Sequence, residues 1–377
     1  RVFEFEGEFS GFENLTLCLG PLNAQNAQAL RSQIPWLRPQ PIGLATSAGM
    51  GDRLGNATPG HVRAVRGVSG KIAPIFAQQS MREMARTLRS PQQVMDAATW
   101  GIFQEGWNAG IGADADHLKT PADIDPCLAA GFTFFTIDPG EHVDNRAETA
   151  SQSLMRELAA NLPAEVKPKL SGLSGKVFKF EGYQFHIDES SLLKAAVKYG
   201  KAIVHVARMY RRLEQQASSQ AFELEVSVDE TDQPTSHLEH IYIASELKRM
   251  GVQWVSLAPR YLGRFEKGGD FIGDLAAFTH DFAVHAAIAR HFGPYKLSLH
   301  SGSDKFSIYP IASKHTKGMV HLKTAGTSYL EALRTIAEIN PDFLREIYIF
   351  ARQRYEIDRR SYHVSARLEH APLPEAV

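Results

Sequence analysis

Short apolar runs recur along the chain, and each ends in a polar or glycine-containing turn. Eight runs stand out, at residues 41–47, 71–77, 108–117, 132–138, 222–229, 252–259, 295–301 and 318–323. Between most of them, as at 80–90, 236–251 and 273–293, apolar residues recur at the three- and four-residue steps of amphipathic helices. Strands that alternate with helices indicate a parallel sheet, and eight of them predict an α/β fold of the closed (β/α)8, TIM-like barrel type.

The regular alternation is interrupted once, between the fourth and fifth predicted strands. After residue 138 the next barrel strand does not begin until about residue 222. The residues between contain KVFKFEGYQFHID (176–188), which alternates like strands, and a long helical pattern at 190–216. We interpret 140–218 as an insertion that carries a small β piece and a long helix. No low-complexity linker divides the chain, so we expect one barrel domain over residues 1–377.

The overall charge is nearly balanced, which narrows the classes of partner. Lys and Arg number 41 and Asp and Glu number 42, and 44% of the 377 residues are hydrophobic. This composition supports a sizeable core and gives no electrostatic reason to expect nucleic acid or an anionic membrane as a partner. Cys18 and Cys127 are too few for a disulfide framework. No apolar run approaches the roughly 20 residues that span a bilayer, so we expect a cytoplasmic protein.

The tetrapeptide HLKT occurs twice, at 117–120 and 321–324, and each copy lies near the end of a predicted strand. Barrel enzymes carry their chemistry at the C-terminal ends of strands, so both copies are expected to open onto the same end of the barrel. Another strand delivers His300 there. His117, His300 and His321 together predict a site for a divalent metal (Zn, Ni, Co or Mn) with a coordination position left for substrate. Each histidine taken singly is more simply explained as a structural one.

Charged side chains near the same strand ends are candidates for the chemical step. Asp116, Asp229 and Glu230 are candidate acids and bases, and Glu225 inside its strand is a further candidate metal ligand. Lys119 and Lys323 each follow a histidine by two residues, which in a strand places them on the same side. Either lysine is suited to stabilise an oxyanion. The alternatives are ion pairs within the barrel for the carboxylates and solvated rim positions for the lysines.

Other polar residues near strand ends are candidates for binding the substrate. Arg260 is suited to hold a substrate carboxylate through two hydrogen bonds, with a surface ion pair as the alternative. Ser303, Asp304 and Lys305 follow the strand that delivers His300. The glycine-containing loop at 47–55 lacks the dinucleotide fingerprint, and its Arg53 is a weak candidate for an anion contact. A histidine-rich helix over 280–291 has its histidines five and six residues apart, which favours positions on the helix surface.

Several stretches resemble the tagaturonate epimerase family, which includes related tagatose 4-epimerases. They are GADADHLKT (112–120), VSVDETDQPTSHLEHIYIA (226–244), RYLGRFEKGGDFIGD (260–274), YKLSLHSGSDKFSIYP (295–310) and HLKTAGTSYLEALR (321–334). The resemblance is densest over 220–335. It implies a metal-dependent epimerase, an isomerase that interconverts D-tagaturonate and D-fructuronate by inverting one hydroxyl-bearing carbon. His117, His300 and His321 fall in the motifs expected to build the site.

The inverted carbon is β to the ketone, so its proton is not acidic and enolisation alone cannot invert it. Retro-aldol cleavage, rotation of the aldehyde fragment and re-addition is the favoured route. Transient oxidation is the other, and it needs a nicotinamide for which the chain shows no fingerprint. We expect the metal on the three histidines, acid–base work from Asp116, Asp229 or Glu230, and oxyanion stabilisation by Lys119 and Lys323. In this hypothesis Arg260 and Lys305 hold the substrate carboxylate.

Three alternatives stay open at this point. One is an epimerase of neutral ketohexoses, which would interconvert fructose and tagatose. Another is a metal-dependent aldolase or isomerase on the same barrel, and the last is a sugar-binding protein without catalysis. The expected partner in each case is a small keto-sugar or keto-uronate, and the sequence leaves open whether the chain forms a homo-oligomer.

Overall fold

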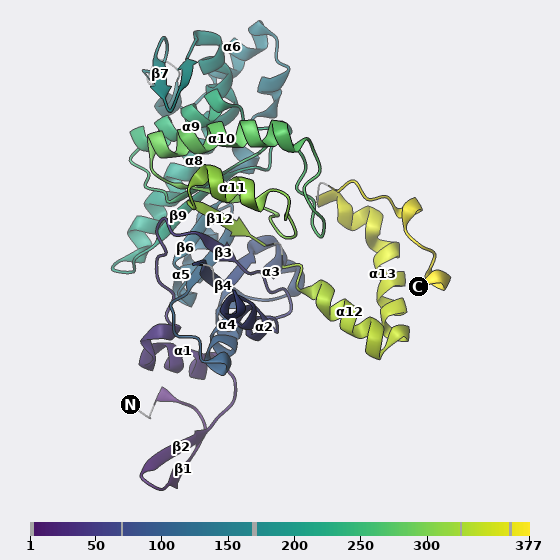
Figure 1. The fold of residues 1–377 in the computed structure, drawn as a ribbon. Coiled ribbons are helices and arrows are strands. Elements are labelled where there is room, and N and C mark those ends of the chain that lie inside the picture. The colour runs from purple at the N-terminus through teal and green to yellow at the C-terminus, as the bar shows by residue number, and fades with distance from the viewer. Residues whose placement is uncertain (1–3, 69–70, 168–171, 325, 362–363) are drawn as a thin grey trace.

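The computed structural model describes residues 4–68, 71–167, 172–324, 326–361 and 364–377. At its centre eight parallel strands close into a barrel in the order β10-β11-β12-β3-β4-β5-β6-β9 (Figure 1). The barrel strands are β3 (Ser47–Gly49), β4 (Ala73–Ser80), β5 (Gly112–Leu118), β6 (Phe134–Ile137), β9 (Glu223–Val228), β10 (Ser256–Pro259), β11 (Lys296–Leu299) and β12 (Val320–Lys323). The predicted barrel is confirmed, and each predicted apolar run contains or borders one of its strands.

Helices follow the barrel strands and cover the outside of the barrel (Figure 1). They are α2 (Thr58–Gly67), α3 (Met81–Thr87), α4 (Pro91–Glu105), α5 (Pro121–Ala130), α8 (Glu189–Ala217), α9 (His237–Arg249), α10 (Leu275–Phe292) and α11 (Tyr309–Thr316). Local sequence fixes their ends. In α4, Ser90 and Gln93 form a capping box, and Gly106 ends the helix with a φ of 60°, a conformation that glycine adopts without strain.

The segment between β6 and β9 contains the predicted β piece and the predicted long helix. It begins with α6 (Gln152–Ala160), continues through the antiparallel hairpin of β7 (Val177–Phe180) and β8 (Tyr183–His186), and ends with α8. The 29-residue α8 packs against α5 on one side and α9 on the other. It therefore occupies the place of the barrel helix between β6 and β9, while α6 and the hairpin lie outside the helical ring.

Two further pieces extend from the barrel in Figure 1. At the N-terminal side, β1 (Glu8–Phe12) and β2 (Leu15–Leu19) form an exposed hairpin that precedes α1 (Ala24–Gln33). At the C-terminal side, α12 (Tyr329–Ile339) and α13 (Pro341–Asp358) pack on each other and contain no buried side chain. No described helix has the length and apolar character needed to cross a membrane.

Candidate active site

A cavity of about 580 Å³ opens at the C-terminal ends of the barrel strands. Its wall is built by residues at or just beyond the ends of β4, β5, β9, β10, β11 and β12, and by the loop that follows β10. This is the end of the barrel where chemistry was predicted, because each parallel strand delivers its last side chains to the same rim.

A buried lysine lies at the floor of this cavity. Lys323 Nζ is 2.8 Å from Asp114 Oδ2, 2.7 Å from Asp116 Oδ1 and 3.0 Å from Glu225 Oε1. Burial alone would lower the pKa of Lys323, but these three carboxylates raise it well above its usual value. The ammonium therefore stays charged and fixes the orientation of the carboxylates around it.

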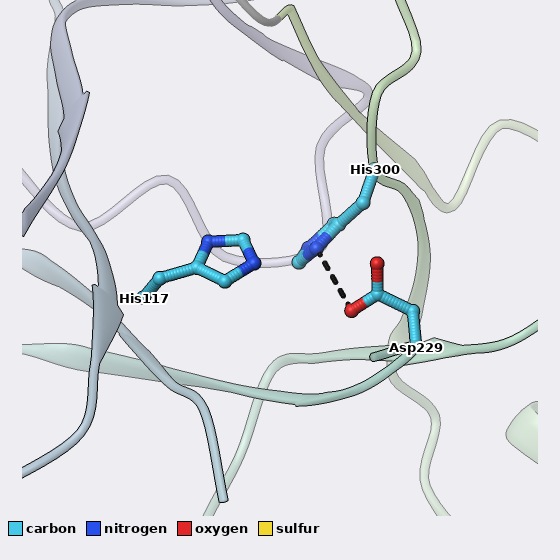
Figure 2. A group of neighbouring side chains, drawn as sticks. All are labelled: His117, Asp229 and His300. Carbon is cyan, nitrogen blue, oxygen red and sulfur yellow. Dashed lines mark ion pairs between the residues drawn. The ribbon is translucent and has the colours of Figure 1, made fainter. Parts of the chain in front are cut away.

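Two histidines and one aspartate of the same cavity wall lie close to one another (Figure 2). His117 follows from β5, His300 from β11 and Asp229 from β9, and each offers one ligand atom within 4.8 Å of the other two. His300 Nδ1 lies 3.2 Å from Asp229 Oδ1, and the rings of His117 and His300 are 5.0 Å apart. Imidazole and carboxylate in this arrangement form a donor set suited to a divalent transition metal.

Each of the two histidines also contacts a carboxylate of the barrel through its other ring nitrogen. His117 Nδ1 is 2.6 Å from Asp116 Oδ1, and His300 Nε2 is 2.8 Å from Glu225 Oε1. These contacts leave His117 Nε2 and His300 Nδ1 as the nitrogens available to the cavity. Carboxylates that orient metal-binding imidazoles in this way are the usual outer support of a metal site.

The electrostatics of the group favour positive charge. Burial alone would lower the pKa of both imidazoles, but Asp116 raises the pKa of His117, and Asp229 and Glu225 raise that of His300 well above its usual value. Conversely, the histidines help hold the pKa of Asp229 well below its usual value against the effect of burial. Because imidazole binds a metal in its neutral form, a cation held between His117, His300 and Asp229 would replace the protons that these carboxylates stabilise.

His321, the third predicted histidine, lies deeper in the barrel. It is fully buried, its Nδ1 is 2.9 Å from Ser47 Oγ, and its Nε2 is 4.0 Å from Asp114 Oδ2. Burial lowers its pKa, so it stays neutral. The structure does not bring His321 to the other two histidines, and the residue that lies with them is Asp229.

The other predicted acid–base and oxyanion residues lie in two places, the cavity floor and the cavity rim. Asp116 and Lys323 belong to the buried network on the cavity floor. Glu230 and Lys119 lie at the rim, where Lys119 Nζ is 3.5 Å from Asp138 Oδ2 and 3.9 Å from Glu230 Oε2. Asp138 and Glu230 also form a second potential cation group with His117, and the ammonium of Lys119 is adjacent to both carboxylates.

Of the predicted substrate-binding residues, Arg260 and the weak candidate Arg53 line the cavity, whereas Ser303, Asp304 and Lys305 do not. Lys305 is fully buried, and its Nζ donates to the backbone carbonyls of Glu266, Gly269 and Ser303. Ser303 and Asp304 likewise lie outside the described cavity wall. This turn after β11 therefore secures the loop that follows β10, and the structure does not bring it to the site.

Several residues of the cavity wall were not predicted from the sequence. Tyr261 lines the cavity, and no described residue pairs with its hydroxyl by a hydrogen bond. Gln78 Nε2 donates to Asp116 Oδ2 over 3.0 Å. Three cationic side chains also reach the wall, namely Arg53, Arg82 and Lys267. Arg53 was predicted only as a weak anion contact. Tyr261 and Lys267 lie in the loop after β10, and Gln78 in β4 and Arg82 in α3 carry no recognisable motif.

Comparison with known proteins places this architecture in one family. The tagaturonate epimerase family matches residues 3–377. The tagaturonate/fructuronate epimerase of Thermotoga maritima is 48% identical over 355 residues, covering 94% of this chain and 73% of that protein. The native crystal structure of fructuronate-tagaturonate epimerase UxaE from Cohnella laeviribosi superposes with a TM-score of 0.91 at 41% identity, covering 100% of this chain and 75% of that one. A glycerol complex of the same Cohnella laeviribosi enzyme superposes with a TM-score of 0.92 at 40% identity.

Proposed function

Since the chain belongs to the tagaturonate epimerase family and is thus an isomerase-class enzyme, we propose that it interconverts D-tagaturonate and D-fructuronate in a metal-dependent reaction. The observation that carries the metal dependence is the convergence of His117, His300 and Asp229 on one point of the cavity. We assign the ligand set to these three residues, with Asp229 in the place first given to His321. A bound divalent ion would supply positive charge for the oxygens on the ketone side of the substrate.

The retro-aldol route assigns the proton transfers to a carboxylate at the rim. A base removes the proton of the β-hydroxyl, the bond between the α and β carbons breaks, and its electron pair moves to the ketone side as an enediolate. The aldehyde fragment rotates and adds back through its other face, and the same carboxylate returns the proton. Glu230 suits this role because it is partly exposed in the cavity, whereas Asp116 is fixed between Lys323 and His117.

Cationic side chains on the cavity wall support a uronate as the substrate. Arg53, Arg82 and Lys267 line the cavity together with Arg260, and a substrate carboxylate is the group that such a set recognises. Glu83 is 3.5 Å from Arg53 and 4.0 Å from Lys267, so one protein carboxylate balances part of this charge. A neutral ketohexose would leave these cations without a substrate anion, and this favours tagaturonate over tagatose.

Metal removal and restoration test the proposal. The protein is stripped with EDTA, and tagaturonate is followed by NMR with and without Zn²⁺, Ni²⁺, Co²⁺ or Mn²⁺. We expect fructuronate to form only after a metal is restored, and His117→Ala to remain inactive, while His280→Ala, an exposed histidine on α10, keeps full turnover. Full turnover of stripped protein would refute metal dependence. Absence of fructuronate with every metal would refute the epimerase, and fructose would then be tested as a neutral substrate.

The retro-aldol route has its own test. Cleavage generates short fragments inside the cavity, so a carbonyl trap present during turnover should capture a trace of the aldehyde. Normal epimerisation without any trapped fragment, and without isotope exchange between labelled aldehyde and product, would contradict this route while leaving the epimerase activity intact.

A further inference from the structure

A second group of metal-type ligands lies outside the barrel cavity. His237 begins α9, and Asp281 and His285 lie one turn apart on α10. The spacing of histidines in α10 had favoured the helix surface, and for His285 this prediction is wrong, because α10 packs that face against α9 and leaves His285 fully buried. None of these three residues lines the barrel cavity.

The three side chains direct polar atoms at one another. Each offers a ligand atom within 4.8 Å of the other two. His237 Nε2 is 2.9 Å from Asp281 Oδ1, and His285 Nε2 is 3.6 Å from Asp281 Oδ2. His285 Nε2 and Asp281 Oδ2 are sealed from solvent, and no described residue forms a hydrogen bond of normal geometry with either atom. Buried polar atoms that remain unpaired are rare in folded proteins, and two at one point suggest a missing ligand.

A buried hydrogen-bond chain fixes which nitrogen of His285 faces the group. His285 Nδ1 is 2.8 Å from His240 Nδ1, and His240 Nε2 is 2.8 Å from the hydroxyl of Tyr295. With His285 Nδ1 engaged by His240, Nε2 is the ring nitrogen of His285 that faces Asp281. A second nitrogen held by such a chain is the usual support of a metal-binding imidazole.

We propose that His237, Asp281 and His285 bind a divalent transition metal of the zinc class, at a site separate from the barrel cavity. Two imidazoles and one carboxylate provide three of the four positions of a tetrahedral site. A water would supply the fourth ligand, and His237 and Asp281 line a cavity of about 550 Å³ beside the group.

The location gives this ion a positioning role. Asp281 accepts a backbone hydrogen bond from Leu262, and the adjacent Tyr261 packs edge-on against His285 with 5.8 Å between the ring centres. Tyr261 in turn lines the reaction cavity. A metal held by α9 and α10 thus ties both helices to the segment after β10 that presents Tyr261 to the substrate.

Metal counting in a background without the barrel site tests the proposal. In a His117→Ala protein, incubated with Zn²⁺ or Co²⁺ and dialysed, elemental analysis should find about one ion per chain. Asp281→Asn or His237→Gln added to that background should remove the ion and the visible Co²⁺ absorption. These two changes are close in shape to the native side chains, and both residues are partly exposed, so folding is preserved.

The matched control is His280→Ala, which removes the exposed histidine that precedes Asp281. It should retain the ion and the metal-dependent rise in melting temperature that the two cluster variants lose. Equal metal content in all the proteins, or an equal loss in His280→Ala, would overturn the proposal. The test does not depend on turnover, so it stands apart from the proposed epimerase activity.

Discussion

At the scale of single residues, the two HLKT copies show how the same tetrapeptide places its histidine at two different depths in the barrel. The pairing of β5 with β6 shifts register between Ala115 and Leu118, and His117 adopts a φ of 56°. This irregularity turns His117 to face His300 in the cavity. In β12 the pairing is regular, so His321 faces the layer below, toward Ser47, and Lys323 reaches the cavity floor.

Asp116 should act on the metal through His117. Replacing it with asparagine, Asp116→Asn, removes the negative charge that orients Nδ1 and raises the basicity of the ring. We expect metal affinity at the barrel site to fall by about 10- to 100-fold. Titration with Co²⁺ followed by visible absorption measures this affinity. Asp125→Asn, an exposed carboxylate on α5, is the control and should bind as the native protein does. Equal affinity in all three would disprove the orienting role.

Lys267 should give substrate binding a pH dependence in the mildly alkaline range. Burial, with Arg53 and Arg82 nearby, lowers its pKa to about 8, so the ammonium is present below pH 8 and is lost as the pH rises above it. Loss of a charged hydrogen bond is worth roughly 1.5–3 kcal/mol, so KM for tagaturonate should rise by about tenfold or more above pH 8. Lys267→Arg stays charged and should flatten the profile. Identical KM profiles in the two proteins would contradict a carboxylate contact at this residue.

At the scale of secondary-structure elements, the sequence predicted much of the architecture. It did not predict much of the cavity wall. The eight strands were predictable because each fully buried barrel strand is a short apolar run between turns. Strand ends then located His117, Asp229 and His300, because parallel strands deliver their last residues to one rim. Tyr261 and Lys267 escaped prediction because they lie after β10 in a loop whose path depends on distant contacts, such as that of Lys305 with Gly269.

Helix α8 should depend on one buried lysine. Lys198 is fully buried, with its Nζ 2.5 Å from Glu148 and 3.2 Å from Glu239 of α9, so it joins the segment after β6 to the helical ring. Lys198→Met leaves both carboxylates without their buried partner and should lower the free energy of unfolding by about 3–5 kcal/mol. Lys194→Met breaks an exposed ion pair with the same Glu148 and should cost about 0–1 kcal/mol. Urea denaturation compares them, and equal losses would contradict the assignment.

At the scale of the whole molecule, α12, α13 and the residues after them form a C-terminal arm that lines part of the cavity. In Figure 1 this arm stands beside the barrel, and the end of α13 lies near the loop that follows β10 before the chain runs on to the C-terminus. Ser365 donates through its backbone N and its Oγ to Glu266 Oε2, at 3.0 and 2.8 Å. Arg360, Val364 and Ser365 all line the cavity. The arm therefore completes a wall that the barrel strands alone leave open.

Removal of this wall should weaken substrate binding more than it weakens the fold. A chain that ends at Asp358 keeps the barrel and α13 but loses the three wall residues, so water enters the side of the cavity near Glu266. We expect KM to rise by about tenfold, equivalent to roughly 1.4 kcal/mol of binding free energy, with the barrel's circular dichroism and melting behaviour retained. A chain that ends at Ala371 keeps the wall residues and should bind as the full chain does. If both shortened chains keep the KM of the full chain, the arm has no part in the site.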